Sequence, residues 1–238
     1  MTESKLQPTL DQAEIHFLGE GSLTLSVTGV TSVTSASSVV VSATLDCQQR
    51  LWAIAAKANA WPHVRDVVPG MNNLTILFDP LVADVDDLAD KLLAAWNKSI
   101  AVTKSGRHIA IPVVYGGDRG PDLTAVAEHT GLSVAEVIRR HTASDYIVFF
   151  LGFQPGFAYM GGLDPLLATP RRREPRLIVP AGSVAIGGSQ TAIYPAASPG
   201  GWQLIGHSDV RLFDPSAAPP TLLQPGDRVR FVASGDLS

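Results

Sequence analysis

The sequence predicts an α+β fold in which a small N-terminal α/β sandwich domain precedes a C-terminal β barrel. Its length and composition allow two cores, because the 238 residues are 45% hydrophobic and only 17% charged. Apolar residues recur at strand and helix periods in the first half, whereas Gly and Pro separate short apolar runs in the second. A polar run at residues 97–106 divides these patterns, so we place the domains at residues 1–104 and 105–238.

The first domain is predicted to alternate strands with helices. Leu23, Leu25 and Val27 alternate with polar residues, which is the period of a half-buried strand. Residues 74–78 repeat this alternation. An Ala-rich helical pattern predicts a helix over residues 45–58. The predicted order is therefore strand, helix, strand, helix.

Two further features complete the first domain. The Ser- and Thr-rich stretch at residues 31–38 is typical of a loop. The second helix is predicted to begin after Asp84, a residue type that caps helix N-termini, and to reach Trp96. Asp86 and Asp87 would then lie at the positive end of this helix, where acidic side chains are favourable.

The second domain is predicted to consist of short strands with one helical interruption. Two short helices are expected between residues 122 and 142, the second opening with Ser133 and Glu136 as a capping box. Short strands separated by turns indicate a closed or nearly closed barrel. The expected strands are residues 107–115, 146–153, 176–180, 184–188, 191–194, 202–205 and 229–232.

Charge and cysteine content exclude several classes of function. A net charge of −4 provides no basic surface for a polyanion, so we expect neither a nucleic-acid nor a membrane partner. The single cysteine, Cys47, cannot form an internal disulfide, and no apolar run is long enough for a signal peptide or a membrane span. We expect a cytoplasmic protein.

The familiar enzyme signatures are absent from the sequence. It contains no Gly-x-Ser-x-Gly elbow, no P-loop ending in Gly-Lys-Ser/Thr and no His-Glu-x-x-His. The six histidines lack metal-ligand spacing, so no metal site is expected. The glycine-rich run at residues 116–120 offers backbone amides to an anion, but this signal is weak and the run is more typical of a turn.

The most informative stretch is residues 152–208. Its first eight residues hold two glycines, a proline and three aromatics, and the arginines 171–173 and Arg176 follow. Such turns present aromatic faces and guanidinium groups, which are the components of a site for a small planar anion or for a partner's loop. Each piece alone is also typical of turns, a barrel core and a solvated edge.

These residues resemble the family that includes allophanate hydrolase subunit 1, the B-type subunit of 5-oxoprolinase and the inhibitor of a sporulation histidine kinase. The resemblance implies an N-terminal α+β domain and a cyclophilin-like C-terminal barrel, in agreement with the division above. The matching blocks are residues 152–159, Pro175-Arg176 to Ile186, Gln190-Thr191 with Ile193-Tyr194-Pro195, and Ser198-Pro-Gly-Gly-Trp-Gln-Leu-Ile-Gly206, with looser matches that include His108 to Tyr115, Gly120-Pro-Asp-Leu123 and His141.

The chain departs from the family pattern after Gly206. The family usually continues Ile-Gly-Arg-Thr, whereas this chain has His207 and Ser208. Histidine replaces an always-charged planar fork with a group whose charge depends on pH. The departure bears on the substrate rather than on the fold.

The resemblance implies a heteromeric, ATP-dependent hydrolase that is inactive as an isolated chain. The partners would be a homologous second subunit, similar to allophanate hydrolase subunit 2 or to the C-type subunit of 5-oxoprolinase, and a third subunit in 5-oxoprolinase. ATP, with Mg, would drive opening of the lactam of 5-oxoproline to give glutamate, and it is open whether ATP contacts this subunit or its partner. Two alternatives remain: a histidine-kinase inhibitor that acts by protein binding, and a subunit of a urea- or allophanate-processing enzyme.

The matching blocks also supply candidate site residues, and we expect the barrel turns to bring them to one shared pocket. Arg176 is the expected anion contact because positioned cations stabilise carboxylates and phosphoryl groups. His108 and His141 are the proton carriers in matching segments. The expected substrate-binding residues are Gln154 and Tyr159 as hydrogen-bonding groups, Phe157 and Trp202 as apolar walls, and Arg172 and Arg173 as further cations.

Overall fold

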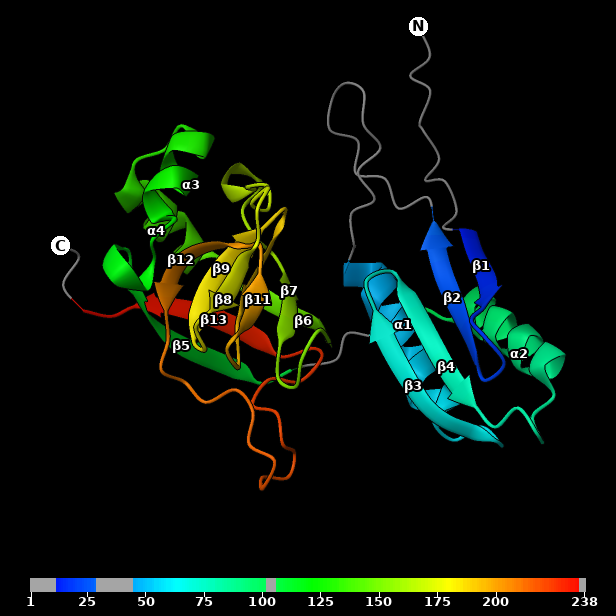
Figure 1. Ribbon diagram of the computed structural model, residues 1–238. Helices are drawn as coiled ribbons and strands as arrows, with labels where there is room; N and C mark the ends of the chain where they lie inside the picture. Colours follow the sequence, from blue (N-terminus) through cyan, green and yellow to red (C-terminus); the bar gives the residue numbers. More distant parts are fainter. Residues whose placement is uncertain (1–11, 29–44, 102–105, 236–238) are drawn as a thin grey trace, which may run out of the picture. The chain divides into compact units, whose positions relative to one another are not determined.

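The computed structural model describes residues 12–28, 45–101 and 106–235 (Figure 1). The expected loop at residues 31–38 lies outside this described part. The chain divides into two compact units, residues 1–103 and 104–238, so the division falls one residue from the sequence-based boundary.

The N-terminal unit is a four-stranded antiparallel sheet with two helices. The sheet order is β1-β2-β4-β3, and α1 and α2 contact each other as well as the sheet, so they share one of its faces (Figure 1). The order along the chain is strand, strand, helix, strand, strand, helix, which corrects the simpler predicted alternation. The elements are β1 Gln12–Phe17, β2 Ser22–Thr28, α1 Leu45–Ala58, β3 Val64–Gly70, β4 Asn73–Phe78 and α2 Val85–Lys98.

The second helix forms as its sequence predicts. The Asp84 side chain accepts a hydrogen bond from the backbone N–H of Asp87, which satisfies one of the unpaired donors of the first turn. Leu88, Leu92 and Trp96 recur every fourth residue and are buried against the sheet.

The C-terminal unit contains a closed seven-stranded barrel, as the short strands predicted. Its order is β10-β7-β6-β13-β5-β12-β9, and β13 runs parallel to β5. Closure leaves none of these seven strands as an edge. The barrel strands are β5 His108–Tyr115, β6 Tyr146–Leu151, β7 Ala158–Gly161, β9 Ser183–Gly187, β10 Gln190–Ile193, β12 Gln203–His207 and β13 Arg228–Ala233.

A separate two-stranded ribbon and two helices accompany the barrel. The ribbon pairs β8 (Arg176–Val179) with β11 (Ser198–Gly200). The helices α3 (Leu123–Thr130) and α4 (Val134–Ala143) contact β12 and β13 respectively (Figure 1). Ser133 accepts a hydrogen bond from the backbone N–H of Glu136, which confirms the capping at the start of α4.

Candidate functional site

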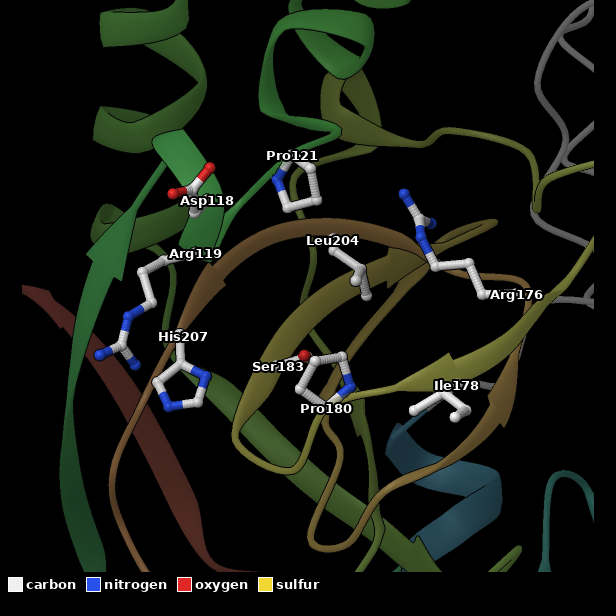
Figure 2. Close-up of a pocket in the computed structure, with 9 residues that line it drawn as sticks. All are labelled: Asp118, Arg119, Pro121, Arg176, Ile178, Pro180, Ser183, Leu204 and His207. Atoms are coloured by element: carbon white, nitrogen blue, oxygen red, sulfur yellow. The ribbon is translucent and has the colours of Figure 1, made fainter.

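A cavity of about 260 Å³ opens beside the ribbon of the C-terminal unit (Figure 2). Its wall comes from the segment after β5, from β8 and from the barrel strands β9 and β12. The view shows Arg176 and His207 at opposite ends. The lining residues are Asp118, Arg119, Pro121, Arg176, Ile178, Pro180, Ser183, Leu204 and His207.

Arg176 is fixed at its end of the cavity by a buried carboxylate. Its Nη2 donates to Oδ1 of Asp122 at 2.7 Å, and Nη1 of Arg172 reaches the same oxygen at 3.3 Å. The side chain of Asp122 is 7% exposed, against 23% for Arg176 and 37% for Arg172. Two guanidinium groups therefore share one carboxylate, and this end of the cavity carries an excess of positive charge.

The position of Asp122 is set by the backbone of β12. Its N–H donates to the carbonyl of Leu204, and its Oδ2 accepts from the N–H of Leu204 at 2.7 Å. Gly120 makes this approach possible, because a Cβ there would overlap the carbonyl group of Ile205. The segment between β5 and α3 is thus docked on the barrel through main-chain bonds.

His207 lies at the other end, among charged groups. Its Nε2 is 3.0 Å from Oδ1 of Asp209, and Nη1 of Arg119 is 3.7 Å from that same oxygen. The Asp209 side chain is 87% exposed, so water screens this cluster. His207, which stands where the resemblance led us to expect an arginine, therefore lines the cavity.

A second, smaller cavity of about 120 Å³ is lined largely by aromatic rings. Phe157 meets Trp202 edge to face at a centroid distance of 5.8 Å and Tyr194 at 5.3 Å. Arg171 lies at its rim, with Cζ 5.5 Å from the centroid of the Trp202 ring. Phe153, Tyr159, Pro199, Gly200 and Gly201 complete the lining.

The structure has two cavities where a single shared pocket was expected. Phe157, Tyr159 and Trp202 line the aromatic cavity, whereas Arg176 lines the larger one. The two are neighbours, because Gly200, which lines the aromatic cavity, is the strand partner of Arg176 in the ribbon. The expectation was wrong because the side chain of Arg176 is hydrogen-bonded to Asp122, which was not among the candidate residues.

His141 belongs to the barrel core and not to either cavity. It is fully buried and stacks on Phe231 at a centroid distance of 4.6 Å. Its ring nitrogens lie 2.7 Å from the hydroxyl of Tyr115 and 2.9 Å from that of Thr191. Burial lowers the pKa of His141 to about 3 and raises that of Tyr115. The proton-carrier role is therefore replaced by a structural one.

His108 is exposed at the first residue of β5, whereas Tyr115, at the other end of that strand, pairs with β12. His108 lines a separate cavity of about 210 Å³ with Asp145, Arg228 and Arg230. His108 therefore lies about the length of β5 away from the Arg176 cavity, which is lined by residues that follow this strand. The structure therefore does not bring His108 together with the other candidates.

The remaining candidates are surface or wall residues. The amide of Gln154 donates to the backbone carbonyl of Ala196 at 3.3 Å. Tyr159 stacks on Phe150 at 4.5 Å, and burial raises the pKa of Tyr159. Arg173 is exposed and lines neither the Arg176 cavity nor the aromatic cavity.

Sequence reasoning did not single out Asp118, Arg119, Asp122 or Arg171 as site residues. A signal existed for Asp122, because Gly120-Pro-Asp-Leu123 was among the matching segments. Asp118 and Arg119 lie in the glycine-rich run that is more typical of a turn. No local pattern distinguishes Arg171 from its neighbours.

Two structural features bear on metals and membranes. Within residues 12–28, 45–101 and 106–235, no three His, Cys, Asp or Glu side chains gather as a metal site would require. None of the helices in the described part of the chain is both long and apolar enough to span a membrane.

Relatives of the chain share both its sequence and its domain type. A family model for the carboxyltransferase domain, subdomain C and D, matches residues 23–223. The B-type subunit of 5-oxoprolinase from Escherichia coli O157:H7 is 52% identical over 189 residues, which cover 79% of this chain and 87% of that relative. The B-type subunit of 5-oxoprolinase from Haemophilus influenzae is 48% identical, and the match covers 81% of this chain and 90% of that relative.

Solved structures extend the comparison to the fold. The crystal structure of TTHA0988 matches with a TM-score of 0.69 at 39% identity, over 80% of this chain, which spans 37% of TTHA0988. The urea carboxylase of Kluyveromyces lactis matches with a TM-score of 0.73 over 94% of this chain and 22% of its own length. Its identity is 18%, so that match shows the shared fold alone.

The family match covers most of the chain, and the relatives are aligned over most of their own lengths. The chain therefore belongs to the carboxyltransferase subdomain C and D family, in the group that contains the B-type subunits of 5-oxoprolinase.

Proposed function

We propose that this chain is a subunit of an ATP-dependent 5-oxoprolinase, which opens the lactam of 5-oxoproline to give glutamate. The observation that carries the proposal is the 52% identity to a B-type 5-oxoprolinase subunit over 87% of that relative's length. The positively charged cavity at Arg176 supports it, because 5-oxoproline is a small carboxylate.

The chemistry of the lactam accounts for ATP in the proposal. An unstrained amide is a poor electrophile, and ATP supplies a phosphoryl group that activates its oxygen. The cavity of about 260 Å³ lies below the range of about 300–1,000 Å³ that is typical of pockets for larger ligands. It is therefore a poor fit for a nucleotide, and we assign ATP and its Mg to a site that the partner subunit completes.

The partner in this proposal is a homologous second subunit, similar to the C-type subunit of 5-oxoprolinase or to allophanate hydrolase subunit 2, with a third subunit completing the enzyme. The relatives are each named as one lettered subunit of 5-oxoprolinase, which supports a multi-subunit enzyme. The length of TTHA0988, of which this chain spans 37%, supports a fold that works beside additional polypeptide. The isolated chain is expected to be inactive, and the use of ATP favours the cytoplasm.

The proposal is tested by assembling this chain with its second and third subunits. The complex is incubated with ATP and Mg and with 5-oxoproline, urea or allophanate in parallel. We expect glutamate from 5-oxoproline and no turnover of the other two compounds. Hydrolysis of urea or allophanate without any glutamate from 5-oxoproline would contradict the proposal.

A further inference from the structure

The Arg176 end of the larger cavity has unbalanced charge. Arg172 and Arg176 both bond to Oδ1 of Asp122, so two positive groups face a single negative one. The acidic side chain in the lining, Asp118, lies across Pro121 from the Arg176 guanidinium (Figure 2). An anion bound beside Arg176 would restore the balance.

The guanidinium of Arg176 also has an unused donor. Nη2 is bonded to Asp122, whereas Nη1 is buried and has no hydrogen-bond partner among the described residues. A buried donor without an acceptor is costly, and a guanidinium forms strong charge-assisted hydrogen bonds with carboxylates. Nη1 itself has almost no exposed surface, so a carboxylate in the cavity would reach it only after a small shift of the guanidinium, which Asp122 holds through Nη2.

The rest of the cavity suits the body of a small acid. Ile178, Pro180 and Leu204 provide apolar surface, and Ser183 adds a hydroxyl between the two ends (Figure 2). These groups match a compact ring that carries methylene groups on one side and a polar amide on another. The volume of about 260 Å³ is adequate for such a ring.

We propose that this cavity is the subsite for the substrate carboxylate, with Arg176 as its contact and Asp122 as the positioning residue that fixes Arg176. This assignment rests on the proposed function for the identity of the substrate. It separates the two cavities by role, because the aromatic cavity around Trp202 then takes no part in binding the carboxylate.

The test compares 5-oxoproline with its uncharged carboxamide as substrates of the assembled enzyme. The wild type is expected to prefer the acid in kcat/KM. Arg176→Met is expected to reduce this preference by about 10- to 100-fold, which corresponds to one lost charge-assisted hydrogen bond. Arg139→Met is the matched control, since Arg139 is an exposed arginine of the same unit that pairs with Glu136. An unchanged preference in Arg176→Met would overturn the subsite while leaving the proposed function intact.

Two additions keep the test decisive. If Arg176→Met does not fold, Arg176→Lys takes its place in the comparison. This variant retains the charge but not the planar fork, so it is expected to lose part of the preference for the acid. Binding of 5-oxoproline to the full-length isolated chain is measured by calorimetry for each variant. Weaker binding in the Arg176 variants without any turnover by the wild-type complex would retain the subsite and refute the proposed function. Equal binding in all variants, or none in the wild type together with no turnover, would refute the subsite.

Discussion

The hydroxyl of Tyr115 lies 2.7 Å from Nδ1 of His141 in the interior of the barrel. The opposite nitrogen, Nε2, is 2.9 Å from the hydroxyl of Thr191, which donates its own proton to the carbonyl of Ala185. Thr191 must therefore accept from His141, so Nε2 carries the hydrogen and Nδ1 accepts from Tyr115. The neutral imidazole has both nitrogens satisfied and has no acceptor for a second proton.

The first prediction follows from this neutral histidine. Burial lowers the pKa of His141 from 6.5 to about 3, so between these values the unfolded chain binds a proton that the folded chain does not. The free energy of unfolding should thus fall as the pH drops from 6.5 towards 3, by about 1.4 kcal/mol per pH unit from this group. Denaturant titrations of the C-terminal unit at several pH values measure the effect.

His141→Gln isolates this contribution from those of the carboxylates. The variant should be less stable at neutral pH and should show a shallower loss of stability on acidification. His129→Gln is the control, because that ring is exposed on α3. An identical slope in wild type and His141→Gln would contradict the prediction.

The second prediction concerns the carboxylate of Asp122. Asp122→Ala should lower the free energy of unfolding by about 3 kcal/mol, because it leaves Arg176 and the N–H of Leu204 without their partner. Arg172→Ala should cost at most about 1 kcal/mol, since its contact is longer and its side chain is more exposed. Urea denaturation compares the two variants, and equal losses would argue against Asp122 as the organising group.

The third prediction concerns the close approach at Gly120. Gly120→Ala should destabilise the C-terminal unit by about 1–3 kcal/mol, because the added methyl group overlaps the backbone of Ile205. Gly152→Ala should have little effect, since its Cβ would meet the Tyr159 ring at an ordinary 3.6 Å. Thermal unfolding of both variants provides the comparison. A Gly120→Ala protein as stable as Gly152→Ala would show that the loop is not docked as described.

The fourth prediction compares the loss of stability when a buried and an exposed aromatic side chain are removed. Trp202 is 5% exposed and packs against Phe157 and Tyr159, so Trp202→Ala should cost about 3–5 kcal/mol. Phe153 is 61% exposed, so Phe153→Ala should cost much less. Chemical denaturation is the measurement, and a Trp202→Ala protein of nearly wild-type stability would contradict the packing of the aromatic cavity.

Local patterns predicted the helices and most of the barrel. The α1 and α2 helices were found where apolar spacing and the Asp84 cap placed them, because such signals act within one or two turns. The β1 and β3 strands were missed. Both lie at the edges of their sheet, and β3 carries Arg65, Asp66 and Pro69, which weaken the pattern of a strand.

The site was less predictable than the fold because its contacts join distant parts of the chain. Arg176 was identified from its matching block, but its partner Asp122 lies 54 residues earlier. Periodicity carries no information on such a pair. His141 was misassigned for a related reason: its burial depends on Tyr115, Thr191 and Phe231, which come from separate barrel strands.

The most direct test of the account is an omission experiment with the purified subunits, ATP and 5-oxoproline. Glutamate release should require this chain, should be absent when the chain is left out, and should return in proportion to the amount of chain added back. Full ATP-dependent glutamate release by the other subunits without this chain would contradict the account.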